Sequence, residues 1–132
     1  MNTLEIETLL LRDEQCAPIF GGVCAADVFA NRLALTDQPQ GIYVVNTDDS
    51  SRPGMHWVAL RITNKKLKFF YFFGLPPDLY PDLATALKAL GLPIVYNTTR
   101  LQQPLTDVCG QYCIAYCYAS VRGFDLDTIV IY

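Results

Sequence analysis

The sequence has little charge and almost no histidine. Charged residues make up only 17% of its 132 residues and hydrophobic residues 52%, a balance that excludes an intrinsically disordered chain. The formal net charge is −3 and the few basic residues form no cluster large enough to attract nucleic acid, so binding to DNA is not expected. The apolar runs are far shorter than the roughly 20 residues of a membrane-spanning helix, so no association with a membrane is expected either.

The cysteines lack the spacing of a disulfide framework or a zinc site. There are five, an odd number, and no secretory signal peptide is expected, which favours a reducing intracellular compartment. Cys109, Cys113 and Cys117 recur every fourth residue, but no Cys-x-x-Cys pair accompanies them and the chain has one histidine. We therefore expect no metal ion and no cofactor. Cys113 and Cys117 are predicted to be buried small hydrophobic residues, and Cys16 and Cys24 to be structural.

Hydrophobic periodicity and turn residues divide the chain, residues 1–132, into the elements of one domain. We predict helices over residues 3–11, 23–30, 81–90 and 109–119, the first capped by Thr3, and strands over 42–46, 56–63, 67–73 and 94–97. Turn-rich loops are predicted over 48–54 and 98–107, and 124–132 fits either a strand or a helix. Strands lying between helices, with a hairpin in the middle, predict an α+β fold. A mixed central β-sheet would pack against the apolar helix 109–119, which would carry Cys109 next to the strand of His56.

Two short segments contain the residue types of thiol chemistry. A cysteine attacks as the thiolate, and an ordinary pKa of about 8.5 leaves little thiolate at neutral pH. A nearby imidazole can take the proton, and a helix N-terminus favours the anion. Thr106-Asp107 is typical of a helix N-cap, which would put Cys109 in the first turn. If Cys109 is a nucleophile, His56 is its base, because the chain has no other histidine.

The same segments contain candidates for binding an oxyanion. The backbone N–H groups of a first helical turn have no partner within the helix, and Gln102 supplies a side-chain amide nearby. A donor aimed at the oxyanion of an acyl-transfer intermediate lowers the barrier by about 3–4 kcal/mol. Gly110 has no Cβ, so the backbone of a substrate could approach closely there.

These residues resemble the adenovirus-type cysteine proteases (adenain), which are relatives of the SUMO-specific proteases. The family's pattern is His-Trp on a strand, an acid within Phe-acid-x-Phe-Gly, and a glutamine followed after six residues by Cys-Gly. His56-Trp57, Gln102 and Cys109-Gly110 match it in this order and at these spacings. The similarity spans residues 18–122, most of the chain.

The resemblance implies an adenain-like cysteine protease fold and a thiol endopeptidase. Cys109 would attack the peptide carbonyl, His56 would act as base and then as acid, and Gln102 with the Cys109 N–H would bind the oxyanion. By the same resemblance the substrates would be viral structural precursors, cut after small residues such as glycine. The protein would then act in the host cytoplasm or nucleus, or in the virion.

The resemblance also bears on substrate and partners. Gly54 and Met55, with Trp57 and Gly110, would line a narrow groove for small substrate residues. A protein or peptide is the expected substrate, and an activating peptide is a candidate partner. Adenoviral relatives use DNA as a cofactor, but the acidic charge of this chain does not support carrying that property over.

One position departs from the family. The acid that orients the histidine falls at Tyr71, and a phenol with a pKa of about 10 supplies no carboxylate at neutral pH. Losing that carboxylate costs on the order of 10⁴ in a serine triad, but a thiol is already far more acidic than a hydroxyl. Three interpretations stay open: a working Cys–His dyad with Tyr71 in the orienting position, an acid from elsewhere such as Asp78, or an inactive pseudoprotease that binds peptides or scaffolds an assembly. An isopeptidase for ubiquitin-like modifiers is the alternative hydrolase.

Overall fold

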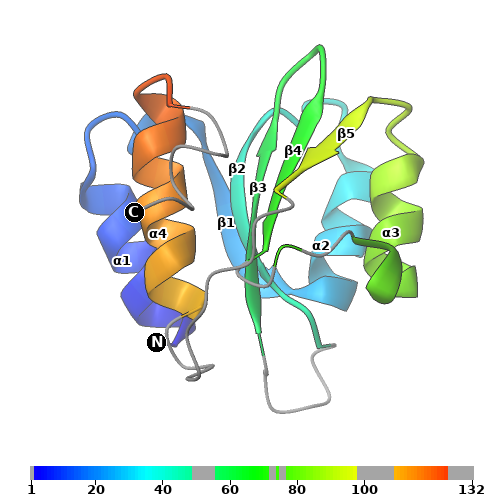
Figure 1. Ribbon diagram of the computed structural model, residues 1–132, viewed down its shortest axis with the longest axis horizontal. Helices are drawn as coiled ribbons and strands as arrows, with labels where there is room; N and C mark the ends of the chain where they lie inside the picture. The colour runs from blue at the N-terminus through cyan, green and yellow to red at the C-terminus, as the bar shows by residue number, and fades with distance from the viewer. Residues whose placement is uncertain (1, 49–55, 72–73, 75–76, 98–108, 125–132) are drawn as a thin grey trace.

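The computed structural model describes residues 2–48, 56–71, 74, 77–97 and 109–124, and of Leu79 and Cys109 it describes the backbone. Within these residues a five-stranded sheet in the order β1-β2-β3-β4-β5 has helices on both faces (Figure 1). The elements in chain order are α1 (Thr3–Arg12), η1 (Ala17–Ile19), β1 (Phe20–Ala25), α2 (Ala26–Leu35), β2 (Gly41–Asn46), β3 (Trp57–Ile62), β4 (Leu67–Tyr71), η2 (Pro77–Leu79), α3 (Pro81–Lys88), β5 (Ile94–Tyr96) and α4 (Cys109–Val121). The predicted α+β fold with a mixed central sheet is confirmed.

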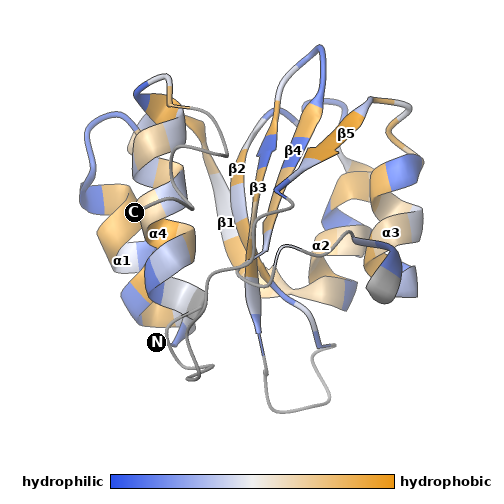
Figure 2. Ribbon diagram, viewed as in Figure 1, coloured by the Kyte–Doolittle hydropathy of each residue, from blue (hydrophilic) through white to orange (hydrophobic). Residues whose placement is uncertain are grey.

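The strand pairing brings the start of β3 and the end of β4 to the same end of the sheet. β3 is antiparallel to both β2 and β4, whereas β1 pairs with β2 and β5 pairs with β4 in parallel. The predicted hairpin is confirmed: Ile62 pairs with Leu67 beside the turn, and Val58 pairs with Tyr71 at the far end. The turn itself is hydrophilic (Figure 2), and the Thr63 hydroxyl accepts hydrogen bonds from its backbone N–H groups.

Two helical layers cover the sheet. α1 and α4 lie on one face, and α2 and α3 lie on the other (Figure 1). On β4, the Phe70 ring stacks on Tyr116 of α4, with ring centroids 4.9 Å apart and planes 2° apart. Because strand side chains alternate, Tyr71 takes the opposite face, which α3 covers. A sheet buried on both faces favours nearly continuous apolar strands, and Figure 2 shows hydrophobic colour running through β2 to β5.

The predicted cap of the first helix is wrong by one residue. Asn2, not Thr3, is the N-cap of α1, and its side-chain oxygen accepts a hydrogen bond from the Glu5 N–H at 2.9 Å. The Glu5 carboxylate in turn accepts from the Asn2 N–H at 3.3 Å. This reciprocal capping box satisfies two backbone donors, which a cap at Thr3 would leave to water.

The helix predicted over residues 23–30 is wrong in its first part, because the chain to Ala25 belongs to β1. α2 begins at Ala26 without any capping side chain, so its start has no signature in the sequence. Two glycines also make β1 hard to predict from the sequence. A Cβ at Gly21 would lie 2.2 Å from the Tyr43 ring, and Gly22 has a φ of +145°, so this strand needs glycine where glycine usually indicates a turn.

α4 is the predicted central helix, and it runs two residues beyond the predicted end. Cys113, Tyr116 and Cys117 on it are fully buried, which confirms the prediction for both cysteines. Throughout the described part of the chain, each helix is too short or too polar to cross a membrane. The loop predicted over 98–107, nearly all of that over 48–54 and nearly all of the ambiguous stretch 124–132 lie outside the described residues.

Candidate active site

His56 directly precedes β3 and lies beside the end of β4. Its carbonyl accepts a hydrogen bond from the Thr47 N–H at 2.9 Å, which ties it to the segment after β2. Its half-buried imidazole meets the ring of Tyr71 edge to face, with centroids 6.0 Å apart and planes 60° apart. The register explains the contact, because Tyr71 pairs with Val58 and His56 is the diagonal neighbour two residues earlier. Two predicted site residues, His56 and Tyr71, are therefore in contact.

Asn97 holds the backbone of Tyr71. Its side-chain oxygen accepts the Tyr71 N–H at 2.9 Å, and its side-chain nitrogen donates to the Tyr71 carbonyl at 2.8 Å. Asn97 directly follows β5 and is only 1% exposed, so its amide extends the pairing between β5 and β4 by one step. Sequence reasoning missed this residue as a site element. The available signal was an amide side chain at the end of the strand predicted over residues 94–97.

Tyr80 holds the side chain of Tyr71. The two hydroxyl groups share a hydrogen bond of 2.8 Å, and the two rings meet edge to face with centroids 5.9 Å apart. Tyr80 comes from the turn that begins α3, nine residues after Tyr71 in the chain. Sequence reasoning also missed this residue, since nothing in the chain pairs these two tyrosines.

Two contacts fix the direction of α4 relative to β3. Tyr116 lies level with Ala59 of β3, because it stacks on Phe70 and Phe70 pairs with Ala59. Further along both elements, the Arg61 guanidinium donates to the carbonyl of Ser120 and to its hydroxyl oxygen, the latter at 3.1 Å. β3 and α4 therefore run in the same direction, as Figure 1 shows.

Counting back from these contacts brings the start of α4 level with His56. From Ala59 to His56 is about 10 Å of extended chain, and from Tyr116 to Cys109 is about 10 Å of helix. The backbones of His56 and Cys109 therefore lie at the same end of the sheet. His56 directly precedes β3, and Cys109 begins α4, which covers one face of the sheet. The side chain of Cys109 lies outside what the structure describes.

The charged side chains at the C-terminal end of α4 complement its dipole, and its start presents the positive end. Arg61 donates to the carbonyl of Ser120, and Arg122 donates to the carbonyl of Tyr118 at 2.8 Å, so two guanidinium groups lie at the negative end of the helix dipole. The first turn of α4 has no acidic residue. A thiolate in that first turn would meet the positive end of the dipole and its unpaired N–H groups.

Of the remaining predicted site residues, the structure describes Trp57 and Gly110. Trp57 opens β3, is half-buried and packs against the core, and Gly110 is buried in the first turn of α4. Gln102, Gly54, Met55 and the predicted cap Thr106-Asp107 lie outside the described residues.

Asp78, the alternative acid, is engaged elsewhere. Its carboxylate lies 3.0 Å from the ammonium group of Lys88, and both side chains are 63% exposed. Among the residues that the structure describes, no three His, Cys, Asp or Glu side chains converge as ligands for a metal ion.

The other cysteines are buried, and the environments of three of them suppress a thiolate. Cys16, Cys24, Cys113 and Cys117 are free thiols and all are buried. Burial, with the carboxylate of Asp13 beside it, raises the pKa of Cys16 to about 12. Burial also raises the pKa of Cys24 and of Cys117. None of these three is suited to act as a nucleophile near neutral pH.

The fold resembles that of a solved protein. A structure of an AvrA deletion variant with IP6 and CoA superposes with a TM-score of 0.55 at 18% sequence identity, covering 91% of this chain and 50% of the AvrA chain. This chain therefore spans about half the length of that protein, and the likeness shows a shared fold, consistent with a cysteine-protease-like α+β fold. No protein-family model and no curated protein matches the sequence.

Proposed function

We propose that this chain is a cysteine endopeptidase with a Cys109–His56 dyad. The observation that supports it best is that the start of α4 and the chain's one histidine lie level at one end of the sheet. The imidazole of His56 is braced there by the ring of Tyr71. The burial of the other cysteines leaves Cys109 as the candidate nucleophile.

The reaction follows from these roles. His56 takes the thiol proton of Cys109, and the thiolate attacks the carbonyl carbon of the scissile peptide bond. Gln102 and the Cys109 N–H bind the oxyanion, after which the imidazolium protonates the leaving amine and the acyl-enzyme forms. His56 then takes a proton from water, whose oxygen attacks the thioester, releasing the carboxylic acid product and restoring the thiol.

The proposed substrate is a protein or peptide cleaved after a small residue. Gly110 lies in the first turn of α4, and its missing side chain would allow the backbone of a substrate to approach the start of that helix. The groove residues Gly54, Met55 and Trp57 and the viral-type precursor substrate come from the family resemblance and complete the proposal.

The decisive measurement is the pH dependence of Cys109 alkylation, resolved by peptide mass spectrometry, in wild type and His56→Ala. We expect wild-type Cys109 to react with iodoacetamide well below pH 8 and His56→Ala to lose that reactivity. Equal profiles in the two proteins would contradict the dyad and favour a pseudoprotease that binds peptides without cleaving them.

Turnover tests the same proposal directly. Peptides with glycine before the scissile bond should be cleaved by wild type and not by Cys109→Ala, which should keep the wild-type circular dichroism spectrum. Residual cleavage by Cys109→Ala would exclude the mechanism. Covalent capture of a ubiquitin-like protein with a reactive C-terminus, without cleavage of linear precursors, would identify the isopeptidase instead.

Acyl transfer is a second candidate, and the likeness in fold to AvrA, whose structure contains CoA, favours it. The same thiolate could attack the thioester of an acyl-CoA, releasing the CoA thiol and leaving an acyl group on Cys109 for an amine or hydroxyl of a second protein. Incubation with acetyl-CoA followed by peptide mass spectrometry separates the candidates. Acetylated Cys109 with no peptide cleavage would favour the transferase.

A further inference from the structure

We propose that Tyr80 is a positioning residue for His56 and acts through Tyr71. The inference rests on the proposed function, since it assigns a role in orienting the base of the Cys109–His56 dyad. It answers the question raised by Tyr71, which occupies the position of an orienting acid without supplying a carboxylate.

Three aromatic rings form a continuous row from the beginning of α3 to the beginning of β3. The Tyr80 ring meets the Tyr71 ring at 5.9 Å between centroids and 70° between planes. The Tyr71 ring meets the His56 imidazole at 6.0 Å and 60°. Edge-to-face contacts bring the positive edge of one ring to the negative face of the next, so their energy depends on angle as well as on distance.

Tyr80 is held rigidly at its backbone. Its N–H donates to the Pro77 carbonyl at 2.9 Å, and its carbonyl accepts the Ala84 N–H at 2.8 Å. It is the N-cap residue of α3, and Pro81 follows at the first helical position, where its fixed φ suits a helix start. Leu83 and Leu87 of α3 are fully buried, so the whole helix is anchored in the core. The hydroxyl of Tyr80 is therefore presented from a fixed support.

Tyr71 needs that support at its ring. Asn97 and the pairing with Val58 fix its backbone, but neither contact reaches its hydroxyl. The residue is only 3% exposed, and a buried phenol requires a hydrogen-bond partner. The 2.8 Å hydrogen bond with the Tyr80 hydroxyl meets this need and sets the angle at which the ring meets His56. Tyr71 thus orients the base by ring contact, where the family uses an ion pair.

The test is Tyr80→Phe, which removes one hydroxyl and keeps the ring. Tyr118→Phe is the matched control, because the partly buried Tyr118 hydroxyl also makes one hydrogen bond, donating to the Leu9 carbonyl at 3.0 Å, far from His56. The first readout is the NMR signal of the carbon-bound ring protons of His56, which needs no assignment because the chain has no other histidine. The second is the rate of Cys109 alkylation at pH 7.

We expect Tyr80→Phe to shift the His56 ring signals, because the Tyr71 ring current acts on them, and to lower the alkylation rate about two- to tenfold, the size of one hydrogen bond. Tyr118→Phe should leave both readouts at wild-type values. Unchanged His56 signals in Tyr80→Phe would overturn the inference, as would shifted signals with an unchanged alkylation rate or equal effects of the two variants.

Cys109 alkylation in His56→Ala distinguishes failure of the proposed dyad from failure of the role of Tyr80. If wild type and His56→Ala alkylate Cys109 at the same rate, the dyad itself is absent and Tyr80 loses its role with it. If His56→Ala abolishes the reactivity but Tyr80→Phe does not change it, the dyad stands and the positioning by Tyr80 is overturned.

Discussion

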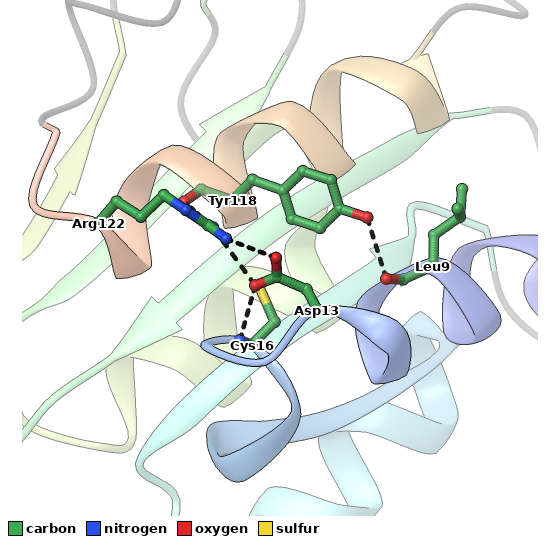
Figure 3. A network of polar contacts seen from close by, with 5 residues as sticks. All are labelled: Leu9, Asp13, Cys16, Tyr118 and Arg122. Carbon is green, nitrogen blue, oxygen red and sulfur yellow. Dashed lines mark hydrogen bonds and ion pairs between the residues drawn. The ribbon is translucent and has the colours of Figure 1, made fainter.

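Polar networks near the two ends of α4 use different chemistry. At its C-terminal end, charged groups join α4 to the end of α1: Arg122 Nη2 lies 2.6 Å from Asp13 Oδ1, and Asp13 Oδ2 accepts the Cys16 N–H at 2.9 Å (Figure 3). At the sheet end near its start, neutral hydroxyl and amide groups of Tyr71, Tyr80 and Asn97 make the hydrogen bonds.

Water access explains the difference. The Arg122 side chain is 38% exposed and the Asp13 side chain 13%, so the guanidinium group keeps part of its hydration while it is paired. Tyr71 and Asn97 are 3% and 1% exposed, and a carboxylate at such a site would have to be paired to offset its desolvation. The buried brace formed by Tyr71, Tyr80 and Asn97 consists of neutral groups and avoids that desolvation cost. We therefore expect Tyr71 to orient His56 without carrying a charge.

The comparison extends to two cysteines. Cys16 lies beside a carboxylate and is fully buried, whereas Cys109 begins a helix at the end of the sheet where the chain's histidine lies. The same side chain is therefore expected to be inert at one end of the molecule and reactive at the other.

The largest effect concerns the alkylation of Cys16. A pKa of about 12 leaves only about 10⁻⁴ of this thiol ionised at pH 8, and burial blocks the reagent as well. We expect native Cys16 to react at least about a thousandfold more slowly than Cys16 in urea. Peptide-resolved mass spectrometry measures both rates. Labelling of Cys16 as fast as Cys109 in the native protein would remove the contrast between the two ends.

Asn97→Ala is expected to have the next largest effect. It removes the acceptor of the Tyr71 N–H in a buried site and one of two donors to the Tyr71 carbonyl, which keeps its 2.8 Å hydrogen bond from the Gly74 N–H. A buried donor that loses its acceptor costs about 1–3 kcal/mol. We expect the free energy of unfolding to fall by about 1–3 kcal/mol in urea titrations. Asn31→Ala, on the exposed surface of α2, is the matched control and should change it by less than about 0.5 kcal/mol. An equal loss of unfolding free energy in Asn97→Ala and Asn31→Ala would mean that the buried hydrogen bonds of Asn97 contribute no specific stability.

Strands β2 to β5 and the central helix were predictable because their signals are local. Apolar runs and the turn around Asn64-Lys65 place the hairpin of β3 and β4, and Pro81 and Gly91 bound α3 closely enough to predict it. β1 was not predictable as a strand, since its glycines are needed for contacts with Tyr43 and Arg32 that only the fold creates.

The brace at the candidate site was beyond sequence reasoning for a related reason. Tyr71 was identified from the family resemblance, and His56 from that resemblance and as the chain's one histidine. Their contact follows from the hairpin register. Tyr80 and Asn97 belong to elements whose approach to β4 depends on tertiary packing, and no local pattern links them to Tyr71. Local patterns thus predicted the residues of one hairpin, but not the partners that support them.

Acid should weaken the end of the molecule that contains the ion pair. The Arg122 guanidinium holds the pKa of Asp13 at about 2, below its ordinary value of 3.8. A lowered pKa in the folded state contributes stability above the unfolded pKa, and this contribution is lost as the pH falls through about 4 toward 2. We expect Asp13→Asn to be less stable than wild type at pH 7 and to lose less stability between pH 5 and pH 2, as followed by urea unfolding.

Arg122→Gln is the complementary variant. It keeps the carboxylate and removes its partner, so its pH profile should flatten in the same way as that of Asp13→Asn. If both variants lost as much stability as wild type between pH 5 and pH 2, the ion pair would not be the source of the acid sensitivity. The neutral brace at the other end predicts no such change: the difference in stability between wild type and Tyr80→Phe should be the same at pH 5 and at pH 3.

The smallest effect is expected at Asp78, the one alternative acid considered for the dyad. Its ion pair with Lys88 is 63% exposed on both sides, and pairs of that kind contribute about 0–1 kcal/mol and are screened by salt. Asp78→Asn should therefore change the free energy of unfolding by less than about 1 kcal/mol in urea titrations. It should also leave the pH profile of Cys109 alkylation at the wild-type position. A His56-dependent loss of reactivity in Asp78→Asn would instead show that a carboxylate orients the imidazole, and Tyr71 would then be a packing residue beside it.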